Sequence, residues 1–189
     1  MKPSRYSLSI YLLLAAALFA QGEASQTTNV FTSVRGQQVQ IPAPQAKATV
    51  LVFISSTCPI ANGYAPEVNR LTSDYKSRGV EFFLVHTESD LTQQQAKKHS
   101  KKFAYECAVL LDPKRQLVQK TGATLTPEVA VLSTDGELLY RGRIDDRFPR
   151  IGIQRDKPTK TELRDALEAI LAGKAVTVSR TKAVGCVIE

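Results

Sequence analysis

The sequence of 189 residues predicts an α/β protein with a central mixed sheet and helices on both of its faces. A continuous apolar run at residues 48–54 and a second, mostly apolar run at 80–85 have the length of central strands that are buried on both faces. Asp135-Gly136 separates two short apolar segments and is a strong signal for a β-hairpin. An alternation of strands and helices, followed by an antiparallel hairpin and a closing helix, is typical of such a layered fold.

The remaining elements follow from turn signals and apolar periodicity. Residues 25–47 are polar with a turn at Gly36 and predict a leading strand or hairpin. Between and beyond the two central strands, the pattern predicts helices at 59–78, 91–103 and 113–120, the last closed by Gly122, and a third strand at 108–111.

The last third of the chain contains the hairpin and one further helix. We expect the hairpin strands at 129–132 and 137–141. Apolar residues recur at helical spacing over 161–172, where Gly173 supplies the stop. Thr159 and Glu162 have the spacing of a capping box for this helix.

Composition and charge exclude several classes of protein. Hydrophobic residues make up 43% of the chain and charged residues 23%, which is globular rather than disordered composition. The formal net charge is +7, but Lys and Arg are spread along the chain. The densest basic cluster, at 97–102, is typical of a solvated helix face, so we expect no nucleic-acid partner. Three cysteines are too few for a Cys-rich metal module, and we expect no metal and no cofactor.

The first residues have the pattern of a secretory signal peptide. Lys2 and Arg5 precede an apolar run at 10–20, and small residues follow at Gly22 and Ala24. We therefore expect a signal peptide at 1–24 and a single domain at 25–189 with a C-terminal tail at 174–189. The apolar run is shorter than the roughly 20 residues of a membrane span. The expected location is secreted or periplasmic, without a membrane anchor after cleavage, in a compartment where disulfides persist.

The reactive candidates follow the two central strands, because loops at the carboxyl ends of parallel strands form sites in such sheets. Cys58 comes directly after the first strand and opens a helix, with Pro59 at a favourable first position. A cysteine at a helix N-terminus lies near unpaired N–H groups, which favour the thiolate. His86 ends the neighbouring strand and is a candidate proton acceptor or a structural histidine.

Four features together resemble the thioredoxin-like superfamily. They are Cys58-Pro-Ile-Ala61, Ala65-Pro66, Gly122 and Thr126-Pro127, in this order and spacing. The segment inserted around 89–111 resembles the redoxin branch, that is, relatives of alkyl hydroperoxide reductase and thiol-specific antioxidant proteins. The resemblance covers roughly residues 28–175. It implies a three-layer fold, Cys58 as nucleophile, and a cis-proline loop, Thr126-Pro127, that holds the backbone of a partner.

Two departures from the pattern leave the chemistry open. Ala61 stands where a dithiol oxidoreductase has its second cysteine, and Val52 replaces the buried acid of many thioredoxins. Ser55 matches the hydroxyl that orients peroxide in peroxiredoxins, but Leu51 stands in place of their proline. His86 and Cys58 make only a fragment of a copper site. The alternatives are a thiol–disulfide oxidoreductase acting on protein thiols and disulfides, a peroxidase acting on small peroxides, and a non-enzymatic module that binds a partner or copper.

The resolving cysteine must be remote if there is one. Cys107 begins its strand and would lie at the end of the sheet away from Cys58, whereas Cys186 lies in the tail beyond the last helix. We therefore predict a Cys58–Cys186 disulfide, with a Cys58–Cys107 bridge or a free Cys58 as the alternatives. Arg143, in the charged stretch 141–150, is a candidate supporting residue together with Ser55 and His86, unless that stretch only forms surface ion pairs.

Overall fold

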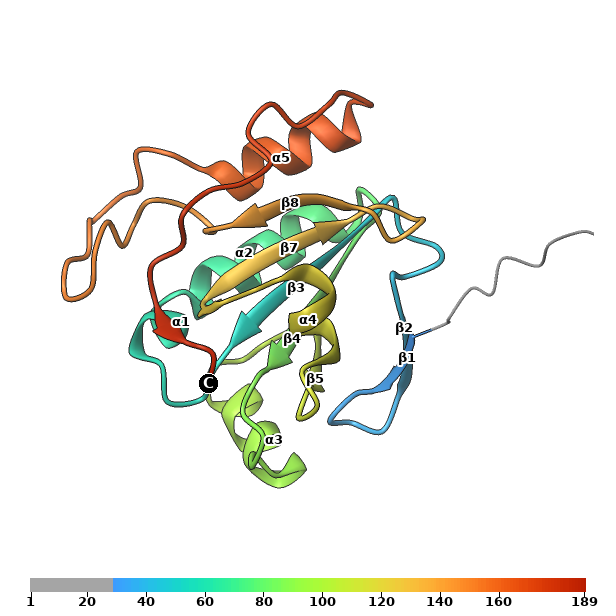
Figure 1. Ribbon diagram of the computed structural model, residues 1–189, viewed down its shortest axis with the longest axis vertical. Helices are drawn as coiled ribbons and strands as arrows, with labels where there is room; N and C mark the ends of the chain where they lie inside the picture. The colour runs from blue at the N-terminus through green and yellow to red at the C-terminus, as the bar shows by residue number, and fades with distance from the viewer. Residues whose placement is uncertain (1–28) are drawn as a thin grey trace, which may run out of the picture.

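The computed structural model describes residues 29–189 (Figure 1). The predicted signal peptide at 1–24 lies outside this range. The described elements run β1 (Asn29–Thr32), β2 (Gln38–Ile41), β3 (Ala48–Ile54), α1 (Pro59–Gly63), α2 (Ala65–Lys76), β4 (Val80–His86), α3 (Gln93–Lys102), β5 (Ala108–Leu111), α4 (Gln116–Thr121), β6 (Leu125–Thr126), β7 (Glu128–Leu132), β8 (Leu138–Gly142), α5 (Glu162–Leu171) and β9 (Cys186–Val187).

A five-stranded mixed sheet lies at the centre, in the order β5-β4-β3-β7-β8. β3, β4 and β5 are parallel. β7 pairs antiparallel with β3, and β8 pairs antiparallel with β7, as the predicted hairpin requires. All seven residues of β3 are buried, which explains why its sequence is apolar without alternation. In the parallel register Ile54 lies opposite His86, so the carboxyl ends of β3 and β4 lie side by side at the same end of the sheet.

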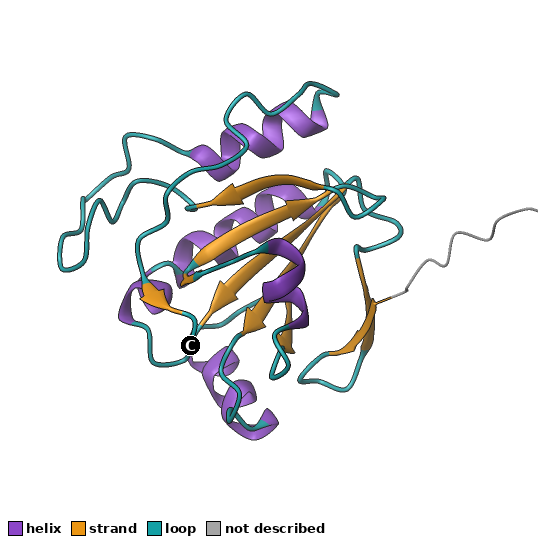
Figure 2. Ribbon diagram, viewed as in Figure 1, coloured by secondary structure: helices purple, strands orange, loops and turns teal. Residues whose placement is uncertain are grey.

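Helices cover both faces of this sheet, which confirms the predicted three layers (Figure 2). Successive side chains of β3 point to opposite faces. Val50 and Val52 pack in the same core as α2 and α5, whereas Leu51 and Phe53 pack with α4. The β1–β2 hairpin contributes Ile41 to the second core.

Two helices differ in detail from the sequence predictions. The expected helix at 59–78 is divided at Tyr64 into α1 and α2, because Pro66 in the first turn of α2 has no backbone N–H to continue the ladder. α4 begins at Gln116 rather than 113, since the carboxylate of Asp112 accepts the N–H groups of Gln116, Leu117 and Val118.

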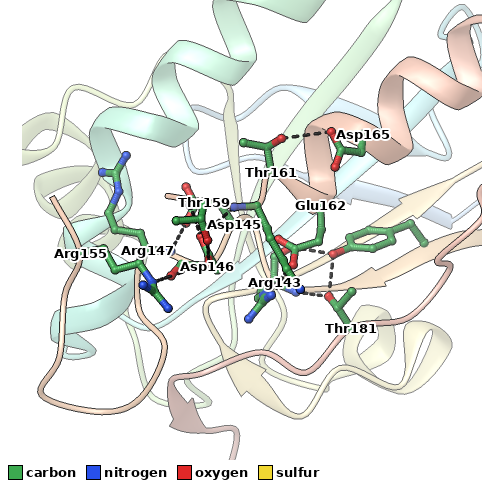
Figure 3. A network of polar contacts seen from close by, with 12 residues as sticks. Arg143, Asp145, Asp146, Arg147, Arg155, Thr159, Thr161, Glu162, Asp165 and Thr181 are labelled. Atoms are coloured by element: carbon green, nitrogen blue, oxygen red, sulfur yellow. Dashed lines mark hydrogen bonds and ion pairs between the residues drawn. The ribbon is translucent and has the colours of Figure 1, made fainter. Parts of the chain in front are cut away.

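The capping box predicted for the last helix is wrong. Thr161 is the N-cap of α5, and its side chain makes no capping hydrogen bond. Thr159 and Glu162 are engaged elsewhere: Thr159 donates to Asp146, and Glu162 accepts from Arg143 (Figure 3). The capping-box pattern paired these two side chains with each other, but in the fold both bond to residues distant in the sequence.

The tail returns across the molecule to the end of the sheet at which β3 and β4 terminate (Figure 1). It bridges to β8 at Arg141, where Thr181 N donates to the Arg141 carbonyl. It then pairs as β9 with β6, in antiparallel register, with Cys186 opposite Thr126. Among residues 29–189 no helix has the length and apolar character to cross a membrane.

Candidate active site

Cys58 lies at the carboxyl end of β3, as the N-cap of α1. Pro59 occupies the start of the helix, and Cys58 N donates to the Ser55 carbonyl at 3.2 Å. The short turn therefore holds Cys58 at the N-terminus of α1. The residue is only 1% exposed, because the tail and the loop before β7 pack over it.

The structure brings Cys186 onto Cys58. The two Sγ atoms lie 2.6 Å apart, and the Cys186 thiol donates to Cys58. A disulfide bond is about 2.05 Å long, so little movement separates the thiol pair from a bridge. The Thr126–Pro127 peptide bond is cis, as the resemblance implied, and the Cys58 thiol lies 3.0 Å from the Thr126 carbonyl that accepts from it.

Gly185 permits this close approach of the tail. A Cβ at this position would fall inside contact distance of the carbonyl oxygen of Thr126 and would crowd Pro127 N. The β6–β9 pairing is reinforced on the C-terminal side, where Ile188 N donates to the Thr124 carbonyl at 3.0 Å. Only glycine therefore fits at 185 with β9 seated, a constraint of close approach rather than of backbone flexibility.

The surroundings of the two sulfurs shift their acidities in opposite directions. Burial disfavours ionisation of Cys58, but hydrogen bonds from the Cys186 thiol, the Ala61 N–H and the Thr126 side chain outweigh it and lower its pKa. Burial and the hydrogen bond with Cys58 raise the pKa of Cys186 to about 11. Cys58 is thus the sulfur that ionises, and Cys186 is the thiol that donates to it.

Cys107 lies away from this pair, as its place in the sequence predicted. It precedes β5, whose first residue Ala108 faces Phe83, whereas the edge with Cys58 is formed by Ile54, His86 and Leu111. The side chain is buried, and burial raises the pKa of its thiol to about 12. This cysteine has the properties of a core residue.

The carboxylate of Glu88, two residues after the end of β4, holds the turn before Cys58 in place. It accepts from Ser56 N at 2.5 Å, from Ser55 Oγ at 3.1 Å and from His86 Nδ1 at 3.2 Å. Burial alone would raise the pKa of Glu88, but the hydrogen bonds from His86 and Ser56 outweigh it and bring the pKa to about 2. Two of the predicted supporting residues, Ser55 and His86, therefore bind Glu88.

Asn62 and His99 extend the same polar group across α1 and α3. Asn62 Nδ2 donates to the Ser56 carbonyl at 3.0 Å, and its Oδ1 lies 2.9 Å from His99 Nε2. The rings of His86 and His99 meet edge to face, with centroids 5.0 Å apart. Burial lowers the pKa of His99 to about 4, and the charge of His86 adds to this effect.

Ion pairs and hydrogen bonds hold the stretch 141–150 in place (Figure 3). Its Phe148 lines a pocket together with Cys186. Arg143 pairs with Glu162, and its backbone N–H donates to Thr181 of the tail at 3.1 Å. Asp145 accepts from the hydroxyl of Tyr64 at 2.6 Å. The guanidinium of Arg143 thus binds Glu162 of α5, and its backbone N–H binds the tail. Arg143 therefore holds the loop and the tail in place.

Within residues 29–189 no group of three or more His, Cys, Asp or Glu side chains is arranged to hold a metal ion.

Comparison with known proteins identifies a family. The family model described as Redoxin matches residues 20–152. A curated relative, the thiol-disulfide oxidoreductase ResA of Bacillus thuringiensis, is 23% identical over 110 residues, which cover 58% of this chain. The match spans only 62% of the length of that relative.

Solved structures share the fold. An uncharacterized conserved protein from Geobacillus kaustophilus superposes with a TM-score of 0.73 at 27% identity, over 85% of this chain and 87% of its own. A putative thiol:disulfide interchange protein DsbE from Chlorobium tepidum gives 0.60 at 19% identity, over 76% of this chain and 93% of its own.

Proposed function

The chain belongs to the Redoxin family, and from that premise we propose that it is a secreted or periplasmic thiol–disulfide oxidoreductase. Cys58 is the nucleophile and Cys186 the remote resolving cysteine. The observation that carries this proposal is the 2.6 Å contact of the two sulfurs beside the cis Thr126–Pro127 bond. The similarity to part of the thiol-disulfide oxidoreductase ResA supports the same chemistry.

The reaction proceeds in two exchanges. The Cys58 thiolate attacks one sulfur of a partner disulfide, a Cys58–partner bond forms, and the other partner sulfur leaves as a thiolate. Cys186 then gives up its proton and attacks the Cys58 sulfur, which closes the Cys58–Cys186 bridge and releases the second partner thiolate. The partner gains two electrons, and the protein is left oxidised.

Thr126 and Pro127 hold the partner backbone during the first exchange. β9 occupies the edge of β6 in the structure, and Cys58 is 1% exposed beneath it. The partner therefore reaches Cys58 only when β9 has left Thr126. Peroxide reduction stays a hypothesis that the geometry does not favour, because the Ser55 hydroxyl is directed to Glu88.

Reduction of a protein disulfide such as that of insulin tests the assignment. We expect Cys58→Ser to reduce the rate to background, and Cys186→Ser to accumulate a mixed disulfide on Cys58 after one exchange. Cys107→Ser is the matched control and should keep the full rate. Wild-type activity in Cys58→Ser would contradict the proposal.

The location has its own test. The sequence pattern at 1–24 predicts export, so N-terminal sequencing of the protein from the periplasm or medium should begin after Ala24 or Ala20. Recovery of the protein with Met1 from the cytoplasm alone would contradict this part of the proposal.

A further inference from the structure

We propose that the oxidised protein is reduced through Cys186, by a dithiol protein that places an apolar side chain in a groove beside this cysteine. The inference rests on the proposed function and concerns its second half, the return of the Cys58–Cys186 bridge to two thiols. In this proposal the reductant attacks Cys186 in the tail rather than Cys58 at the start of α1.

The groove has a volume of about 450 Å³ and lies between the start of α1, the loop after Arg147 and the tail. Its walls include Pro59, Ile60, Phe148, Ile151, Ile153 and Cys186. Ile151 is 74% exposed and Ile153 is 43% exposed, so two large apolar side chains face water beside a sulfur. Exposed apolar surface next to a reactive group is typical of a site that takes a partner.

The two sulfurs differ in access from this groove. Cys186 forms part of its wall and is partly exposed, whereas Cys58 lies 1% exposed against Thr126. Rates of thiol–disulfide exchange depend on which sulfur the incoming thiolate reaches. With β9 seated, an incoming thiolate meets Cys186 first.

A thiolate of the partner attacks Cys186 Sγ, the Cys58–Cys186 bond breaks, and Cys58 leaves as a thiolate. The second thiol of the partner loses its proton and attacks the partner's own bonded sulfur, and Cys186 leaves and takes up a proton. The partner dithiol is oxidised to a disulfide, and this protein gains two electrons.

The hydrogen bonds around Cys58 suit it to the part of leaving group. The Ala61 N–H and the Thr126 side chain stabilise its thiolate. A thiol of lower pKa leaves faster in disulfide exchange. Attack at Cys186 therefore places the negative charge on the better of the two sulfurs, whereas attack at Cys58 would release the sulfur whose pKa is raised.

The first experiment maps the attacked sulfur. Oxidised wild-type protein is mixed with limiting reduced glutathione, quenched early with acid, alkylated and digested. We expect glutathione predominantly on the peptide with Cys186 and the alkyl group on Cys58. Glutathione predominantly on Cys58 would overturn this inference and leave the proposed function standing. If the peptide map shows no Cys58–Cys186 bridge before glutathione is added, both are overturned.

The second experiment tests the groove. Ile151→Ser combined with Ile153→Ser changes only exposed side chains, and the matched control is Val178→Ser, whose side chain is 57% exposed in another part of the surface. We expect the double variant to be reduced roughly fivefold more slowly by benzyl mercaptan, since apolar contact area is lost. Its rate with glutathione, and both rates of the control, should be unchanged. Equal benzyl mercaptan rates in the double variant and wild type would contradict the groove assignment.

Discussion

In the proposed function, Cys58 and Cys186 divide two roles that a single dithiol motif usually combines. Cys58 is held by α1 and by the cis-proline loop, and its ionisation depends on donors that surround it. One of these donors is the Cys186 thiol itself. The remote cysteine therefore acts on Cys58 before any bond forms, because a hydrogen bond to the charged form favours that form.

Cys186→Ala should raise the pKa of Cys58. The variant removes the thiol that donates to the Cys58 thiolate, and a hydrogen bond to the charged form of a group lowers its pKa. The ultraviolet absorbance of the thiolate, followed against pH, measures it without requiring access to the sulfur. Cys107→Ala is the control, since that thiol stays protonated in the same range. A Cys58 pKa that stays unchanged in Cys186→Ala would contradict this account.

The tail is the element that decides access to the site. It is fastened at two places: Thr181 accepts from Arg143 N and contacts the Tyr140 hydroxyl at 2.7 Å, and β9 pairs with β6. The second attachment is short, at two residues, and depends on the missing side chain at Gly185. We therefore expect β9 to detach more readily than the segment around Thr181.

Gly185→Ala should release β9 and expose Cys58. In a Cys186→Ser background, where no bridge forms, we expect the added Gly185→Ala substitution to make iodoacetamide label Cys58 roughly tenfold faster, equivalent to about 1.4 kcal/mol of lost strand docking. Val187→Ala in the same background is the matched control, because its side chain is 72% exposed. The same labelling rate in all three proteins would show that β9 does not cover Cys58.

Across the molecule, a partly buried cluster of polar side chains connects β3, β4, α1 and α3. Glu88 holds the turn after β3, and Asn62 connects that turn to His99 of α3. His99 Nδ1 and His86 Nε2 are buried without a hydrogen-bond partner among the described residues. A protonated His99 therefore places a charge in a desolvated position beside His86 and Lys102, and the Glu88 carboxylate compensates it only in part.

The stability of the protein should fall as the pH is lowered from 6.5 towards 4. The pKa of His99 is about 4 in the fold and 6.5 when unperturbed, so in this window the unfolded chain binds more protons. The expected loss in the free energy of unfolding is about 1–3 kcal/mol. Glu88, with a pKa of about 2, adds its own loss only below its ordinary value of 4.5.

Urea denaturation at several pH values measures this dependence. His99→Gln keeps a donor for Asn62 but does not titrate, so it should flatten the curve between pH 6.5 and 4. Lys98→Gln, on the exposed side of α3, is the control and should retain the wild-type slope. An unchanged slope in His99→Gln would assign the pH dependence to other groups.

The layered fold and the place of Cys58 could be predicted from local sequence pattern. The apolar runs at 48–54 and 108–111 coincide with β3 and β5, because a strand buried on both faces leaves a continuous local pattern. The glycine stops at Gly122 and Gly173 adopt the positive φ that ends a helix. These features depend on neighbours in the chain, and the sequence contains them in full.

Only the tertiary structure decided the polar partners and the position of the tail. Glu88 bonds to Ser56, and His99 to Asn62, across more than thirty residues, and no local period reports such pairs. Thr159 and Glu162 had the spacing of a cap, yet ion pairs and hydrogen bonds with Asp146 and Arg143 took them. The contact between Cys58 and Cys186 followed from the cysteine count as a hypothesis, but the register of β9 on β6 and the close approach at Gly185 place the sulfurs together. Long-range register depends on how whole elements pack, which is why sequence pattern alone does not fix it.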